Sequence, residues 1–298
     1  GKEVWRVMSD VKKATITRIL SAVVGLPVYV VFLYTDKLYA IPALLVTIII
    51  TVVCLLEYYQ MAWKSEEEKP HVAFGVAAGV LINVLMYLYA FGGFGIVRMF
   101  DARVLMALAT VLVASMLIYR LFAKPLKGGI YSLAVTAFGV LYIVLFFSHT
   151  ILIKALPHGF QYLIVLNAVV MINDAAAYFG GVFLGKHKTN FPASPNKSYE
   201  GYAFGLIFSV ITILVCNKII VYTNAIELFS TAEAVALGVV FSILGHLGDL
   251  VESAIKRDSA IKDSGSIIPG HGGMWDVFDA LILSTPFFYY YLIYRSAM

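Results

Sequence analysis

Nine apolar runs of about 20 residues follow one another along this chain, and they constrain its fold more than any other feature. They cover residues 16–34, 40–59, 72–94, 104–122, 130–150, 160–183, 202–222, 232–255 and 278–294. A helix of about 20 apolar residues spans the ~30 Å hydrocarbon core of a bilayer. Because lipid offers no hydrogen-bond partners, each run is expected to be a helix rather than an open strand. The sequence therefore predicts an all-α, polytopic integral membrane protein with about nine transmembrane helices.

The composition excludes the other classes of protein. Hydrophobic residues make up 61% of the chain and charged residues 13%, whereas a soluble domain is typically about 25% charged. Two cysteines cannot support a secreted disulfide scaffold. An aromatic content of 14%, with so little charge, excludes a disordered chain.

The distribution of positive charge predicts the orientation in the membrane. If the N-terminus is cytoplasmic, most of the 22 lysines and arginines fall on the cytoplasmic side of the predicted spans. Loops rich in Lys and Arg stay in the cytoplasm. We therefore expect a cytoplasmic N-terminus and, with nine spans, a C-terminus on the opposite side.

The polar residues that could carry chemistry lie in the second half of the chain. We expect residues 1–159 to form a transmembrane scaffold. Residues 160–298 would form a catalytic transmembrane region with cytoplasmic loops at 184–201 and 256–277. In this region Asp174 interrupts an apolar run, and an aspartate there is costly enough to suggest a function. The alternative is a helix–helix hydrogen-bond partner, or a carboxylate wetted near the interface.

The loop at 185–201 combines glycine, proline, lysine and serine. An ordinary positively charged cytoplasmic loop would explain its lysines. The group formed by Ser194, Lys197, Ser198 and Glu200 is more particular, because a tight turn carrying Lys and Ser donors can cradle a phosphate.

The segment at 246–280 gives the strongest signal. On a helix, Asp249, Ser253 and Lys256 share one face, and Asp276 and Asp279 share another. Mg²⁺ binds one or two carboxylates together with substrate phosphates. Three cations follow closely and could balance phosphate charge, namely Lys256, Arg257 and Lys262. The pattern favours phosphoryl or nucleotidyl transfer, in which positioning and charge stabilisation dominate.

These residues also resemble a known family, the phosphatidate cytidylyltransferases (CDP-diacylglycerol synthases). The matching signature residues are Gly248, Asp249, Glu252, Ser253, Lys256, Arg257, Lys262, Asp263, Gly265, Pro269, Gly270, His271, Gly272, Gly273, Asp276 and Asp279. A second motif matches at Ser194, Pro195, Lys197, Ser198, Glu200 and Gly201, and shorter ones at Asp174 with Tyr178 and at Thr17, Arg18 and Ile19. Two positions depart from the family pattern. Val277 replaces an arginine, which would weaken phosphate binding or leave that role to Arg257, and Ala175 replaces Ser or Thr.

The resemblance implies that CTP and phosphatidate react to give CDP-diacylglycerol and pyrophosphate, with Mg²⁺ and with or without a second cation such as K⁺. It implies catalytic roles for Asp249, Lys256, Arg257, Asp276 and Asp279, with the metal held by Asp249, Asp276 and Asp279. It implies substrate binding by Asp174, Ser194, Lys197, Ser198, Glu200, Ser253, Lys262, Asp263 and His271. It also implies a homodimer in the plasma (inner) membrane, with the active site at the cytoplasmic face and no nucleic-acid partner.

Several alternatives stay open at this point. A CTP-dependent polyprenol or phytol kinase would give a lipid phosphate and CDP, and a catalytically silent relative would give neither product. An ion-coupled transporter would place polar residues near the midplane in both halves, whereas here they gather in one half. Individual residues have plainer readings too: His271 as a turn residue, Glu252 as a partner of Lys256, Asp263 as a loop carboxylate and Asp279 as a helix N-cap.

Overall fold

The computed structural model describes residues 25, 27–35, 40–92, 102–122 and 126–297, and this part of the chain is helical with no strand. Its elements are α2 (Ile41–Ala62), η2 (Glu66–Glu68), α3 (Val72–Phe91), α5 (Ala102–Phe122), α6 (Gly129–Gly139), the π-helical turn η3 (Val140–Leu145), α7 (Phe146–Ala155), α8 (Gly159–Leu184), α9 (Tyr199–Asn224), α10 (Thr231–Asp258) and α11 (Met274–Ser296). The predicted all-α class is confirmed.

Seven helical segments in the described residues are long and apolar enough to cross a membrane. They are Ile41–Ala62, Glu66–Phe91, Gly129–Ala155, Gly159–Leu184, Tyr199–Asn224, Thr231–Asp258 and Met274–Ser296. Helix α5 contains a shorter apolar stretch, Met106–Phe122. Most of the predicted first span (16–34) lies outside the described residues, although residues 27–34 are helical. The chain is therefore a multi-pass membrane protein, and the count of nine spans stays a prediction.

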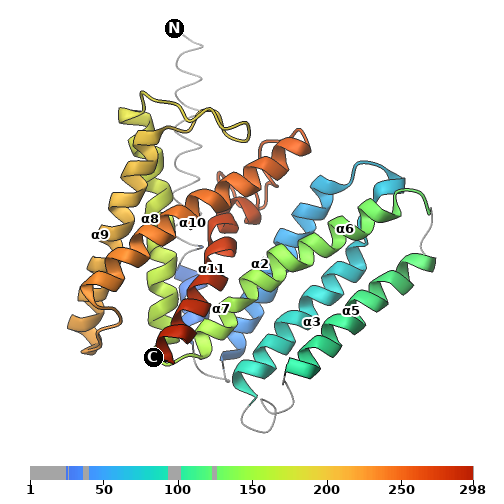
Figure 1. Cartoon of the computed structure of the whole chain (residues 1–298), viewed down its shortest axis with the longest axis horizontal. Helices are drawn as coiled ribbons and strands as arrows, with labels where there is room; N and C mark the ends of the chain where they lie inside the picture. Colours follow the sequence, from blue (N-terminus) through green and yellow to red (C-terminus); the bar gives the residue numbers. More distant parts are fainter. Residues whose placement is uncertain (1–24, 26, 36–39, 93–101, 123–125, 298) are drawn as a thin grey trace.

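The helices form two groups joined by α11. Helices α2, α3, α5 and α6 lie side by side in one group, and α8 and α9 form the other, with α10 crossing obliquely in front of them (Figure 1). Helix α11 contacts α10, α7, α2 and α8. Trp275 in its first turn is 0% exposed, and its ring meets that of Tyr58 edge-on, at a centroid distance of 5.5 Å. This contact fixes the start of α11 between the two groups.

Several helix ends meet at one end of the bundle. There α2 and α10 end, joined by a 2.8 Å ion pair between Lys64 and Asp258, and α11 begins. The hydrogen bond to Asp258 raises the pKa of Lys64, so this lysine stays cationic. The loop between α8 and α9 and the connection between α10 and α11 lie at the same end (Figure 1). Residues from distant parts of the sequence therefore meet there.

Gly248 allows α10 and α11 to approach closely beside the polar residues. A Cβ atom at this position would lie 2.7 Å from the Cα atom of Ala280 and 2.9 Å from the carbonyl oxygen of Asp279. Both are backbone atoms, so only a movement of a whole helix could relieve the clash.

We therefore expect Gly248→Ala to lower the free energy of unfolding by about 1–3 kcal/mol, as overpacking does. Thermal unfolding in detergent measures it. Gly181→Ala is the matched control, since its Cβ would meet only the Ser198 hydroxyl oxygen, at 3.4 Å. Equal melting temperatures for the two variants would contradict the expectation.

Candidate active site

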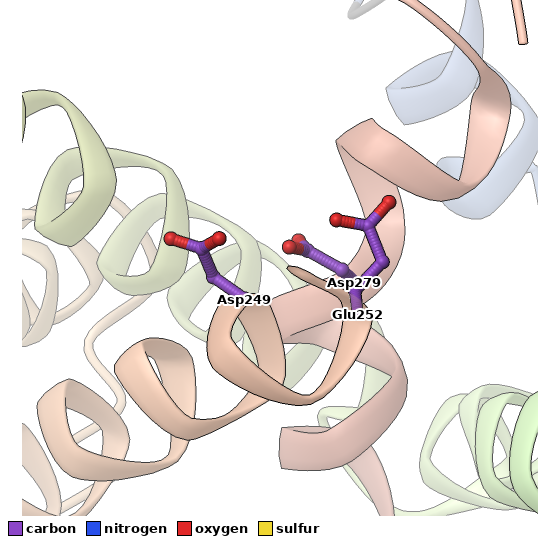
Figure 2. A group of neighbouring side chains, drawn as sticks. All are labelled: Asp249, Glu252 and Asp279. Carbon is purple, nitrogen blue, oxygen red and sulfur yellow. The ribbon is translucent and has the colours of Figure 1, made fainter. Parts of the chain in front are cut away.

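Three carboxylates from two helices share one small space. Asp249 and Glu252 lie one turn apart on α10, and Asp279 faces them from α11 (Figure 2). One oxygen of each lies within 4.8 Å of the others. Glu252 and Asp279 are only 1% and 5% exposed. Carboxylates this close and this buried require compensating cations.

Two lysines supply part of that compensation. The ammonium group of Lys197, from the loop between α8 and α9, donates a hydrogen bond to Asp249. Lys256 is buried between two carboxylates, at 2.7 Å from Glu252 and 2.6 Å from Asp276. Each lysine therefore flanks the three-carboxylate group on one side.

The oxygens of Asp276 are fully engaged. Oδ1 accepts from Lys256, and Oδ2 accepts from the backbone N–H groups of Ser264 and Gly273, at 2.8 and 2.7 Å, and from the Ser264 hydroxyl, at 2.9 Å. Asp276 thus ties the start of α11 to the connection that precedes it.

Glu252 keeps one oxygen open. Its Oε1 atom is buried and accepts no hydrogen bond from the part of the chain that the structure describes. A carboxylate oxygen with free lone pairs, beside two further carboxylates, is the hard-oxygen donor set that divalent cations prefer. Asp249, Glu252 and Asp279 therefore fit a divalent metal.

A cavity of about 560 Å³ opens beside this group, between α8, α9, α10 and the loop that joins α8 to α9. Its lining includes five of the residues with a predicted catalytic or binding role: Asp174, Ser194, Lys197, Ser198 and Asp249. Tyr178 and Val182 also line it and are 64% and 60% exposed on the surface of α8. Asp249 belongs to both the cavity and the acidic group, so the two form one continuous site.

The comparison with known sequences agrees with this arrangement. The family model of the cytidylyltransferase family matches residues 16–295. The chain belongs to this cytidylyltransferase family. The resemblance seen in its motifs is thereby confirmed.

Several individual relatives match parts of this chain. A phosphatidate cytidylyltransferase of Bacillus subtilis (strain 168) is 37% identical over 159 residues, which cover 51% of this chain and 55% of the relative. One of Staphylococcus saprophyticus is 41% identical over 128 residues, covering 43% and 47%. An uncharacterised Escherichia coli protein, YnbB, is 34% identical over 173 residues, covering 56% of each. The chain spans about half the length of the relatives that it matches.

The other residues predicted for the site lie around the acidic group or farther from it. Ser253 donates to Asp249 at 3.3 Å, so these two share a helix face as expected. Ser198 is the N-cap of α9 and accepts the N–H of Gly201. Glu200 pairs with His187 of the loop, at 2.6 Å. The exposed remainder lies at the end of α10 and in the connection to α11: Arg257, Lys262, Asp263 and His271.

The structure tests the alternative interpretations of Glu252 and Asp279. Glu252 does pair with Lys256, as its spacing indicated. The reading of Asp279 as a helix N-cap is wrong, because Gly273 is the N-cap of α11 and Asp279 lies in the second turn. Thr17, Arg18 and Ile19 lie outside the described residues. The ligand and substrate roles of all the named residues stay predictions.

A buried polar group escaped the sequence reasoning. Asn173 is 0% exposed, and its side-chain oxygen accepts from Ser209 at 3.1 Å and from Ser242 at 2.8 Å. Its amide nitrogen lies 3.1 Å from the Nδ1 atom of His246. These bonds join α8, α9 and α10 directly behind Asp174. The sequence feature that could have revealed this group is the amide side chain next to Asp174, inside an apolar run.

We expect Asn173→Ala to lower the free energy of unfolding by about 1–3 kcal/mol, because the two serine hydroxyls would stay buried without their acceptor. Thermal unfolding in detergent measures the loss. Asn224→Ala, at the exposed end of α9, is the control, and an equally small shift in both variants would refute the structural role.

Glu57 was also missed. It lies near the end of the predicted second span, a position typical of a side chain at the membrane interface, but it is only 4% exposed. Its carboxyl group accepts hydrogen bonds from the first backbone N–H groups of α11. A charged residue inside an apolar run was the available signal.

Proposed function

We propose that this protein transfers CMP from CTP to phosphatidate, giving CDP-diacylglycerol and pyrophosphate. One observation carries the proposal: three carboxylates flanked by two lysines adjoin a cavity that opens between membrane-crossing helices. The names of the B. subtilis and S. saprophyticus relatives support the same reaction. Such a site suits a reaction between a soluble nucleotide and a membrane lipid.

In the proposed step, an oxygen of the lipid phosphate attacks the α-phosphorus of CTP. A new oxygen–phosphorus bond forms, the bond from the α-phosphorus to the bridging oxygen breaks, and pyrophosphate leaves with that electron pair. The attacking group is already an anion, so no protein nucleophile is required. The protein contributes by positioning the reactants and balancing charge.

Asp249, Glu252 and Asp279 would hold Mg²⁺, which supplies charge neutralisation for the nucleotide phosphates when bound. The role of Asp276 as a ligand stays a proposal from the resemblance. In the structure its oxygens hold Lys256 and the start of α11. A second cation such as K⁺ is part of the same proposal.

The phosphates would be bound from two sides. Lys197, Ser194 and Ser198 line the cavity and would bind and orient phosphates there, with Asp174 supporting the nucleotide or the metal. At the other side Lys256 lies beside the acidic group. Arg257, Lys262 and His271 occupy the exposed region that follows and would contact the leaving pyrophosphate.

We propose that residues 1–159 serve as scaffold and residues 160–298 as catalytic region, with nine spans and a cytoplasmic N-terminus. The end of the bundle that carries loops 184–201 and 256–277 would face the cytoplasm. Most of the described lysines and arginines support this, because they lie at that end: Lys64, Lys69, Arg120, Lys127, Lys186, Lys188, Lys197, Lys256, Arg257 and Lys262. We place the protein, as a homodimer, in the plasma (inner) membrane.

The test is a product assay with purified protein, labelled CTP, Mg²⁺ and either phosphatidate or a polyprenol in mixed micelles. CDP-diacylglycerol and pyrophosphate, identified by mass, are the expected products from phosphatidate. A polyprenyl phosphate with CDP would instead identify a lipid kinase. Conversion of neither lipid would overturn the proposed function.

A further inference from the structure

Glu57 connects the scaffold half of the chain to the acidic site. It lies near the end of α2, yet its side chain reaches the start of α11, 217 residues later. Oε1 accepts the backbone N–H of Met274 at 2.9 Å, and Oε2 accepts that of Trp275 at 2.9 Å. The first N–H groups of a helix have no partner within the helix and carry a partial positive charge. A carboxyl group from another helix therefore caps α11.

Ser264 extends this cap toward the site. Its hydroxyl lies 3.1 Å from Oε2 of Glu57 and 2.9 Å from Oδ2 of Asp276. Asp276 in turn holds Lys256, and Lys256 holds Glu252 of the acidic group. A continuous chain of polar contacts thus runs from Glu57 to the acidic group.

The turn before α11 is shaped around the Glu57 carboxyl group. A Cβ atom at Gly265 would lie 2.6 Å from Oε1, and one at Gly273 would lie 2.6 Å from Oε2. A side chain at Gly265 would displace the carboxyl group, and one at Gly273 would displace both that group and the Ser264 hydroxyl, which lies closer still. The two glycines therefore leave room for the Glu57 carboxyl group and for the hydroxyl that links it to Asp276.

We propose that Glu57 is a positioning residue for the reaction. It fixes the first turn of α11, so that Asp276 orients Lys256 and Asp279 faces Asp249 and Glu252. This inference rests on the proposed function for its kinetic consequences, but the positioning itself is a property of the fold. The neighbouring Tyr58 packs on Trp275 independently of the carboxyl group, so α11 keeps an anchor when Glu57 is changed.

The test compares Glu57→Gln and Glu57→Asp with a matched control, Glu233→Gln. Glu233 also caps a helix through its carboxyl group, accepting the N–H of Ser230 at 2.8 Å, but it does so at the opposite end of α10. Glutamine places an NH₂ donor against a backbone N–H donor, so one hydrogen bond is lost. Aspartate keeps the carboxylate, but its side chain is one methylene group shorter. Ser264→Ala removes only the hydroxyl link and serves if Glu57→Gln fails to fold.

The first measurement needs no turnover. Backbone hydrogen exchange of residues 264–276 is expected to quicken about fivefold in Glu57→Gln, because a lost hydrogen bond is worth about 1 kcal/mol, and to stay unchanged in Glu233→Gln. Binding of Mn²⁺ alone, followed by electron paramagnetic resonance, is expected to weaken about 10–100-fold, as when partners of metal ligands are removed. Unchanged exchange and unchanged Mn²⁺ binding would overturn the inference.

The second measurement is kinetic. In Glu57→Gln we expect kcat to fall about 10–100-fold, KM for CTP to change little, and Glu57→Asp to recover part of the rate. A fall of similar size in Glu233→Gln would show a general loss of stability and would also overturn it. If the wild-type protein makes no CDP-diacylglycerol, the proposed function fails, while exchange and Mn²⁺ binding still decide the role of Glu57.

Discussion

Asp249→Asn is expected to lower the rate of CMP transfer by about 10²–10³-fold. Asp249 is the one residue that belongs to both the acidic group and the cavity. The amide would remove one negative charge from the acidic group and would leave Lys197 without its ion-pair partner. Loss of one charge-stabilising group at a reacting centre typically costs about 3–4 kcal/mol, which corresponds to that factor.

The comparison is made with Asp258→Asn, nine residues farther along the same helix. Asp258 is exposed and pairs only with Lys64 among the described residues, so its variant should keep the wild-type rate. Initial rates of CDP-diacylglycerol formation at saturating CTP give the ratio. Near-wild-type turnover in Asp249→Asn would remove this residue from the metal site.

Lys256→Met is expected to lose both stability and activity. This lysine is the buried cation between Glu252 and Asp276, and its removal leaves two carboxyl groups facing each other with no cation between them. Breaking a buried pair in this way typically costs about 3–5 kcal/mol. Thermal unfolding in detergent and the CMP-transfer rate are the measurements.

A double variant separates the loss of stability from the loss of activity. In Lys256→Met combined with Glu252→Gln, one charge of each sign is removed, so we expect most of the stability to return. The rate should stay low, because both the cation and a proposed metal ligand are gone. Lys64→Met, at an exposed pair, should change neither quantity by much, since exposed pairs contribute about 0–1 kcal/mol. Recovery of the rate in the double variant would exclude a phosphate-binding role for Lys256.

Much of the site was predictable because its residues lie close together in the sequence. Helical spacing alone places Asp249 and Ser253 on one face of α10, and the structure joins them by a hydrogen bond. The alternation of apolar runs and polar loops likewise predicted loops 184–201 and 256–277 on one side of the membrane, and in the structure both lie at one end of the bundle (Figure 1). Local periodicity carries this information because an apolar run must be helical in lipid.

The sequence did not predict which carboxylates would join the acidic group and which would bind backbone N–H groups. Spacing places Asp276 and Asp279 on the same side of a helix, but it does not show that Asp276 folds back onto the N–H of Gly273 while Asp279 remains with Glu252. Glu57 and Asn173 were missed for a related reason. Their partners lie on other helices, so only the packing of α2 on α11, and of α8 on α9 and α10, reveals what they bind.

The exposed side chains of Tyr178 and Val182 have a consequence for how this protein would meet its lipid. They line the cavity and also face outward from a helix that is long and apolar enough to cross a membrane, so in a bilayer the cavity would border the acyl chains as well as the aqueous loops. A lipid entering from that side diffuses in two dimensions. The quantity that would govern its occupancy is therefore the mole fraction of phosphatidate in the leaflet, whereas CTP occupancy would follow an ordinary bulk concentration.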